Sequence, residues 1–137
     1  MDKRKDLELL IVEDRQVMLK ILRRLLLELG YTRVDEASNG LQALERLGRK
    51  RYDLILSDWN MDGMSGFDLL KAVRADETTK ATPFILVTAE AKRENILAAQ
   101  SAGASGYLLK PFKLDVFEKT LDGVLAAKGD FVNLAVA

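Results

Sequence analysis

Short apolar segments alternate with helical repeats along the chain, and this alternation predicts the fold. Four apolar runs and one weaker, more polar run have the length expected of buried strands. The predicted strands are Leu7–Val12, Arg33–Ala37, Leu54–Leu56, Phe84–Val87 and Tyr107–Leu109. Each is followed by a stretch with the spacing of apolar residues found on the buried side of a helix. The predicted helices are Val17–Leu29, Gly40–Leu47, Phe67–Arg74, Glu94–Ala102 and Leu114–Ala126.

Glycines and apolar positions define the ends and faces of these helices. Gly30, Gly48 and Gly103 directly follow the first, second and fourth predicted helices, where a C-cap glycine is expected. The inward-facing positions of the first helix are predicted to be Val17, Met18, Ile21, Leu22, Leu25, Leu26 and Leu29. Those of the last helix are Phe117, Leu121, Val124 and Leu125. Both helices are therefore expected to pack one apolar side on a sheet.

Strand–helix units in succession predict an α/β fold, with one five-stranded, doubly wound parallel sheet and helices on both of its faces. The chain has 137 residues, the size of one ordinary domain, and contains no internal repeat or low-complexity linker. We therefore predict a single domain over residues 1–127. The tail, Lys128–Ala137, belongs to no predicted element and is expected either to be disordered or to pack on the surface.

Composition narrows the possible chemistry. Lys plus Arg and Asp plus Glu number 21 each, so no overall field draws the chain to nucleic acid or to a membrane. The absence of Cys and His excludes disulfides, thiolate nucleophiles and catalysis by imidazole. No apolar run is long enough to span a bilayer, and Met1–Asp6 is charged with no hydrophobic region behind it. These features predict a cytoplasmic protein whose chemistry depends on carboxylates, hydroxyls, lysines and a hard metal ion.

Reactive side chains follow four of the predicted strands. Glu13 and Asp14 follow the first strand, Asp58 the third after Ser57, Thr88 ends the fourth, and Lys110 follows the fifth. Each residue alone has an ordinary explanation: for example, Asp14 could cap the next helix and Lys110 could be a solvated charge. Ligands of open α/β sheets, however, bind outside the carboxyl ends of the strands, where these residues would meet. Their joint position therefore predicts one polar site.

The charges at this edge predict a metal ion. Two carboxylates about 4 Å apart repel each other by roughly 4 kcal/mol at an effective dielectric constant near 20. Three carboxylates together need a counter-ion, and without His or Cys the site offers only oxygen ligands, which suit Mg²⁺. Mg²⁺ with Lys110 would balance the three carboxylates and leave a site suited to a phosphoryl group.

Four motifs carry a family resemblance over residues 7–127. They are IVED at Ile11–Asp14, SDWNMDGMSG at Ser57–Gly66, VTAEAKRENI at Val87–Ile96 and GASGYLLKPF at Gly103–Phe112. With these motifs the chain resembles the CheY-like receiver domains of two-component response regulators, and most closely their stand-alone chemotaxis type. The resemblance implies a flavodoxin-like sheet with strand order 2-1-3-4-5. It also implies a phosphoacceptor switch rather than an enzyme with a separate substrate.

The resemblance assigns the roles at the site. Asp58 would accept a phosphoryl group, and Glu13, Asp14, Asp58 and the backbone carbonyl of Asn60 would hold Mg²⁺. Lys110 would pair with the phosphoryl oxygens.

The resemblance also implies a switch that begins at Thr88. Its hydroxyl would bond to a phosphoryl oxygen, and Tyr107 would move with it on activation. The output surface would be formed by the fourth helix, fifth strand and fifth helix, with Lys92, Ile96 and Tyr107 exposed on it. The Lys110–Pro111 bond is expected to be cis.

Four features depart from the family pattern, and one of them is Glu13, which replaces the commoner Asp of the acid pair and lengthens one ligand arm. Asp62 stands where a proline is usual, which removes a fixed φ and predicts a looser loop near the metal. Arg15 could reach the phosphoryl site or face solvent. Lys113–Val116 differs from the small polar residues of the chemotaxis type, so the output target stays open.

The partners implied are a sensor histidine kinase or histidine phosphotransfer domain and a downstream protein target, such as a flagellar motor switch, with no direct binding to nucleic acid or membrane. A phosphorelay intermediate, a phosphate sink and a receiver domain excised from a longer regulator remain alternatives. A magnesium-dependent phosphatase of the haloacid-dehalogenase type is disfavoured, because its Asp-x-Asp motif is replaced by Glu13-Asp14-Arg15.

Overall fold

A computed structural model describes residues 3–127 and 131–132 of the chain. Five parallel strands form one sheet in the order β2-β1-β3-β4-β5, which confirms the predicted fold class and strand order. The strands are β1 (Glu8–Val12), β2 (Arg33–Ala37), β3 (Leu54–Asp58), β4 (Phe84–Thr88) and β5 (Gly106–Leu109). The helices are α1 (Gln16–Glu28), α2 (Gly40–Arg49), α3 (Gly66–Ala75), α4 (Arg93–Ser101) and α5 (Leu114–Ala127), and a 3₁₀ turn, η1 (Arg4–Asp6), precedes β1.

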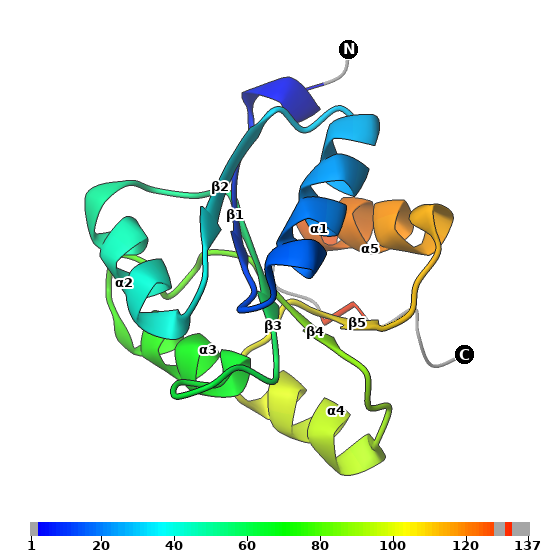
Figure 1. Ribbon diagram of the computed structural model, residues 1–137. Helices are drawn as coiled ribbons and strands as arrows, with labels where there is room; N and C mark the ends of the chain where they lie inside the picture. Colours follow the sequence, from blue (N-terminus) through cyan, green and yellow to red (C-terminus); the bar gives the residue numbers. More distant parts are fainter. Residues whose placement is uncertain (1–2, 128–130, 133–137) are drawn as a thin grey trace.

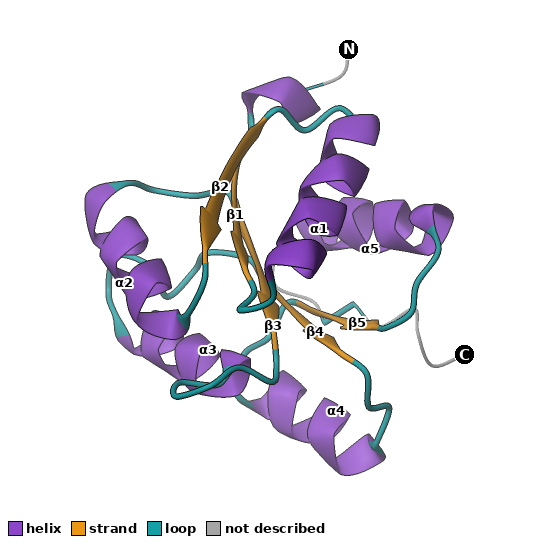
Figure 2. Ribbon diagram, viewed as in Figure 1, coloured by secondary structure: helices purple, strands orange, loops and turns teal. Residues whose placement is uncertain are grey.

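Helices cover both faces of the sheet, as Figures 1 and 2 show. On one face, α1 and α5 pack against side chains of β1, β3, β4 and β5 such as Ile11 and Leu56. On the other face, α2, α3 and α4 pack against the alternate side chains of the same strands, such as Leu10 and Ile55. All five residues of β3 and of β4 are buried, as expected for central strands of a parallel sheet that is covered on both sides.

The strand register brings the reactive residues to one edge. Val12 pairs with Ser57, so Glu13 of the first loop lies beside Asp58. Asp58 pairs with Val87, and Thr88 pairs with Leu109. Because all strands run in the same direction, their carboxyl ends form a continuous polar rim.

Gly66 permits the return of the chain from this rim. A Cβ atom at Gly66 would lie 2.0 Å from the carbonyl oxygen of Asp58, a distance that no side chain tolerates. The Gly66 amide donates to the Trp59 carbonyl at 2.8 Å. Ser65 and Asp68 then form a capping box that starts α3. The loop after Asp58 is therefore held against the strand that carries it.

Two local predictions about the helices were wrong, and the alternative explanation of Asp14 as a helix cap does not hold. Gly48 does not end the second helix, because α2 continues to Arg49. Asp14 does not cap the first helix: the N-cap position is Arg15, without a side-chain hydrogen bond. Val17 and Ile21, predicted to face inward, are 72% and 44% exposed, whereas Leu19, not among the predicted inward positions, is buried. Apolar residues lie around most of this helix, because Val17 and Ile21 stand on the side away from its buried leucines, so apolar spacing alone does not define the buried side.

The tail is described only in part. Phe131 and Val132 are partly buried, and Val132 forms a parallel bridge with Gly106 of β5. Those two residues pack on the surface, one of the two expected outcomes, while the other residues of 128–137 lie outside the described part of the chain. No helix among the described residues is long and apolar enough to cross a bilayer.

We predict that Gly66→Ala is destabilising, by about 1–3 kcal/mol, because the new methyl group overlaps backbone that cannot move away without displacing Asp58. Urea unfolding followed by far-UV circular dichroism measures the effect. Gly48→Ala is the matched control, since its Cβ meets no atom within 4 Å and the helix should gain roughly 0.5–1 kcal/mol. Equal effects of the two substitutions would contradict this account.

Candidate functional site

Three carboxylates gather at the carboxyl edge of the sheet. Glu13, Asp14 and Asp58 each place a carboxylate oxygen within 4.8 Å of the other two. Glu13 is 0% exposed and Asp58 is 6% exposed, while Asp14 is partly exposed. The predicted acidic cluster is thus assembled by residues from two neighbouring strands.

Lys110 is the cation of this cluster. Its Nζ lies 2.7 Å from Asp58 Oδ1 and 3.2 Å from Glu13 Oε1, and its side chain is only 12% exposed. The Lys110 amide donates to the Thr88 carbonyl at 2.7 Å, and the Lys110–Pro111 bond is cis, as predicted. The ammonium therefore bridges the first and third strands from a fixed position at the end of the fifth.

The environment of Glu13 opposes its ionisation. Burial raises the pKa of the Glu13 carboxyl, and the neighbouring charge of Asp58 raises it further. The backbone amide of Arg15, which donates to Glu13 Oε2 at 3.2 Å, and the Lys110 charge lower this pKa but do not cancel the increase. A divalent cation at the cluster would favour the ionised carboxylate.

Thr88 and Tyr107 lie next to each other beyond the acidic cluster. The Thr88 hydroxyl is buried and accepts a hydrogen bond from the Glu90 amide at 3.2 Å. Tyr107 is 0% exposed, and its hydroxyl donates to the Glu90 carbonyl at 2.6 Å. Burial raises the pKa of the Tyr107 hydroxyl, and a hydrogen bond with Thr88 acts in the opposite direction.

The prediction that Tyr107 is exposed was therefore wrong. The ring fills space between the sheet and α4, and its hydroxyl has a backbone acceptor, which makes burial of the polar end acceptable. The other two residues predicted on the output surface differ in exposure: Lys92 is exposed and Ile96 is partly buried.

Trp59 connects the acidic cluster to the tyrosine. Its ring stacks on Phe67 at 5.1 Å between centroids and meets Tyr107 edge-on at 6.3 Å. The Trp59 amide donates to the Val87 carbonyl at 2.8 Å, which continues the β3–β4 ladder past Asp58. The stack of Trp59 on Phe67 was not predicted, because eight positions separate the two residues and no spacing rule pairs them.

The two unusual residues at the site have identifiable contacts. The Asp62 amide, a donor that proline would lack, lies 3.3 Å from Asp14 Oδ2. A hollow of about 250 Å³ adjoins this contact and is lined in part by Asn60 and Met61. Arg15 is 61% exposed and keeps its Nε 3.7 Å from Glu13 Oε2, so it faces solvent at the margin of the cluster.

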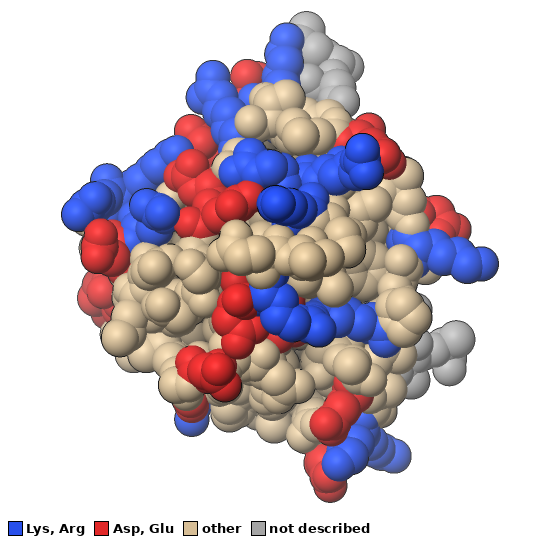
Figure 3. Space-filling model, in the orientation of Figure 1, with Lys and Arg blue, Asp and Glu red and all other residues tan. Residues whose placement is uncertain are grey.

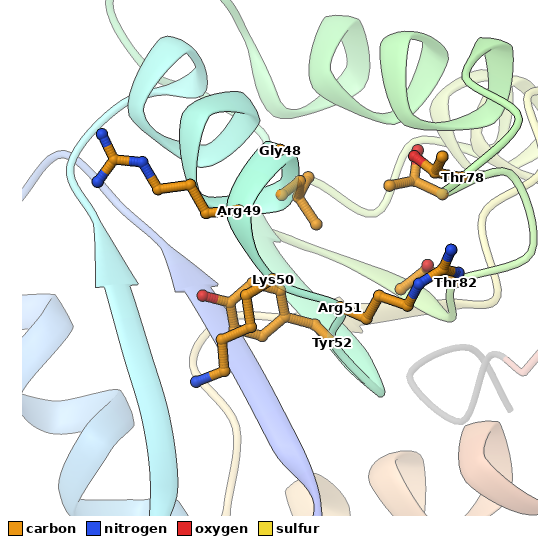
Figure 4. Close-up of a pocket in the computed structure, with 9 residues that line it drawn as sticks. Gly48, Arg49, Lys50, Arg51, Tyr52, Thr78 and Thr82 are labelled. Carbon is orange, nitrogen blue, oxygen red and sulfur yellow. The ribbon is translucent and has the colours of Figure 1, made fainter.

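A second hollow, of about 310 Å³, lies at the opposite ends of the strands (Figure 4). It is bordered by Tyr52, which precedes β3, and by Thr82, which precedes β4. Lys50 at its rim is paired with Glu8 and Asp35, each at 3.1 Å. This hollow is remote from the acidic cluster and takes no part in its chemistry.

The outer surface carries no extended field of one sign on the face that Figure 3 shows. Acidic and basic side chains both occur on it in small groups, with broad uncharged areas between them. The acidic cluster is therefore a local feature.

The donor set fits a magnesium ion. All three clustered side chains offer carboxylate oxygens, and one of them is partly exposed, so a bound ion could keep several waters. When bound, Mg²⁺ would supply positive charge to phosphoryl oxygens. Glu13, Asp14 and Asp58 would hold the ion.

Comparisons with known proteins agree with this geometry. The family model of the response regulator receiver domain matches residues 9–122. The chain is 45% identical over 120 residues to the chemotaxis protein CheY-3 of Vibrio cholerae serotype O1, covering 88% of this chain and 92% of that protein.

Two solved structures extend the comparison. The chemotaxis response regulator CheY4 of Vibrio cholerae has a TM-score of 0.81 and 36% identity, with 86% of this chain and 98% of that one covered. The receiver domain of a sensor histidine kinase from Pseudomonas aeruginosa, solved with a magnesium ion coordinated in its active-site cleft, has a TM-score of 0.78 and 34% identity. The match covers 87% of this chain and 97% of that domain.

We predict that Mg²⁺ raises the free energy of unfolding, by about 2.7 kcal/mol at one hundred times its dissociation constant. Asp58→Asn should be more stable than the native chain without metal, because one of three repelling carboxylates is removed, and should gain less from Mg²⁺. Urea unfolding in EDTA and in Mg²⁺ measures both effects. Glu77→Gln, at an exposed ion pair, is the control and should keep the native response. A native-sized gain in Asp58→Asn would contradict the assignment.

Proposed function

The chain belongs to the response regulator receiver family, and we propose that it is a phosphorylation switch of the CheY type. In this proposal, Asp58 accepts a phosphoryl group from a phosphohistidine of a sensor histidine kinase or phosphotransfer domain, in a Mg²⁺-dependent reaction. The phosphorylated form then binds a protein target through α4, β5 and α5. The observation that carries the proposal is the contact of Lys110 with Asp58 inside the acidic cluster, with Lys110 Nζ 2.7 Å from Asp58 Oδ1.

The chemistry requires little beyond positioning and charge. The Asp58 carboxylate attacks phosphorus, the P–N bond to the donor histidine breaks, and the new P–O bond gives an aspartyl phosphate. Lys110 binds a phosphoryl oxygen, and the backbone carbonyl of Asn60 joins Glu13, Asp14 and Asp58 as a metal ligand. The chain holds its own nucleophile in place, so positioning contributes much of the rate.

The negative charge of the phosphoryl group on Asp58 would change the positions of Thr88 and Tyr107. Thr88 turns its hydroxyl from the Glu90 amide to a phosphoryl oxygen, and the loop that follows β4 moves with it. Tyr107 then loses its present acceptor, the Glu90 carbonyl, and takes a second position. The output surface changes because a two-state element is biased by a local charge.

A second candidate function uses the same phosphorylation of Asp58 but does not lead to binding of an output target. The similarity to a receiver domain of a sensor histidine kinase supports a relay or phosphate-sink role, in which the phosphoryl group is passed on or lost by hydrolysis. A pull-down with the native and the phosphorylated chain separates the two. Retention of a non-kinase target by the phosphorylated form alone favours the chemotaxis-type switch, and retention of phosphotransfer proteins alone favours the relay.

We predict that Trp59 reports phosphorylation directly, because it adjoins Asp58 and contacts Tyr107. Its fluorescence should change on addition of Mg²⁺, change again and saturate with acetyl phosphate, and return when acetyl phosphate is removed. Intact-mass spectrometry should show one added phosphoryl group.

Asp58→Asn is the control and should show neither the acetyl phosphate response nor the added mass. Thr88→Ala should still be phosphorylated but should transmit a smaller fluorescence change. If the folded native chain responds to neither addition, the proposal is wrong, and the chain is a binding module that acts without phosphorylation.

A further inference from the structure

The outer edge of β5 is partly covered by the chain itself. Phe131 and Val132, the short red segment beside β5 in Figure 1, run parallel to this strand. The Tyr107 amide donates to the Val132 carbonyl at 3.1 Å, and the Val132 amide donates to the Ser105 carbonyl at 2.9 Å. These two hydrogen bonds are the ladder of a short added strand.

The side chains of the added strand alternate as those of a strand should. Phe131 packs against the apolar cluster on the α4 side of the sheet, and Val132 packs against the cluster on the α5 side. Both residues are partly buried. The segment is therefore seated by its backbone and by both of its side chains.

Glycines make room for this segment. A Cβ atom at Gly123 of α5 would lie 3.1 Å from Val132 Cγ1, closer than ordinary packing allows. A Cβ atom at Gly106 of β5 would lie 3.3 Å from the Val132 carbonyl oxygen. Gly106 of β5 and Gly123 of α5 thus leave room for the β-branched side chain of Val132, and we call this place the Val132 seat.

The Val132 seat adjoins Tyr107, which belongs to the proposed switch. The amide that pairs with Val132 belongs to Tyr107, whose hydroxyl donates to Glu90 after β4. One residue therefore contacts the tail through its backbone and the switch loop through its side chain.

We propose that the outer edge of β5 is a binding surface for an extended peptide, filled in this structure by Phe131 and Val132. A target that adds a strand to this edge has to displace Phe131 and Val132 and replace their hydrogen bonds to Ser105 and Tyr107 with its own. The segment that fits carries a large aromatic residue followed by a β-branched residue, because that pair occupies the two sides of the edge here. The consequence for target binding rests on the proposed function, whereas the peptide-binding edge does not.

The first test measures tail pairing without any partner. Val132→Pro removes the amide that donates to Ser105, and Gly123→Val places a side chain where that of Val132 lies. In both variants of the full chain the Tyr107 amide should exchange with deuterium at least about tenfold faster, as read by NMR. Val132→Thr keeps the amide and the branched shape and should retain native exchange. Native-like Tyr107 exchange in both displaced variants would overturn the proposal.

The second test supplies the segment in trans. A synthetic peptide with the sequence of residues 128–137 should bind Val132→Pro and restore slow exchange of Tyr107, and should bind the native chain at least about tenfold more weakly. A peptide with Phe131 and Val132 replaced by Ser should not bind. Equal binding to both chains, or no binding at millimolar peptide to a variant with a fast Tyr107 amide, would overturn the proposal.

Both measurements are made without Mg²⁺ or acetyl phosphate. Their failure concerns the edge alone, and a failure of phosphorylation leaves their result standing.

Discussion

The carboxyl edge of the sheet concentrates charges of the same sign in a small, largely buried space. Three carboxylates and the Lys110 ammonium leave a local net charge of −2 (−3 + 1) when all are ionised. Two of the carboxylates, those of Glu13 and Asp58, are buried, and such pairs repel by roughly 4 kcal/mol at about 4 Å and an effective dielectric constant near 20. The folded chain tolerates this repulsion because the carboxylates are attached to buried hydrophobic strands, and the Lys110 ammonium offsets part of it.

The fold is suited to holding charges that repel one another. Glu13 and Lys110 directly follow strands, and Asp58 ends one. These strands are paired within the sheet, which limits local movement of the three charges. Gly66 adds to this rigidity, because the chain passes so close to Asp58 that no side chain fits between. Trp59 and Phe67 close the same turn by stacking. The acidic cluster therefore holds repelling charges close together, and a bound cation would lower this repulsion.

Much of this arrangement could be predicted from the sequence, and the failures have physical causes. The parallel sheet and the meeting of Glu13, Asp58 and Lys110 follow from strand ends, which apolar runs mark well, whereas the strand order was implied by the family resemblance. The buried side of α1 could not be read from spacing, because leucines occupy most of its faces. The depth of Tyr107 depends on a backbone acceptor, the Glu90 carbonyl, supplied by another loop. The pairing of Val132 with β5 involves only a two-residue segment with no period of its own.

Tyr107 shows how a local change of charge could be felt at the edge of the sheet. Its buried hydroxyl donates to the Glu90 carbonyl, so a movement of the loop that carries Glu90 would leave this donor unpaired, at a cost of about 1–3 kcal/mol. The position of the loop and the position of the ring are thus linked energetically. The backbone of the same residue supports the tail at Val132. A rotation of Tyr107 that moves its backbone would weaken its hydrogen bond to Val132. Loss of Val132 from the edge of β5 would in turn make Tyr107, which contacts the Glu90 loop, less firmly held. Tyr107 would therefore couple the proposed switch to the outer edge of β5, because its hydroxyl contacts the loop after β4 and its amide contacts the tail.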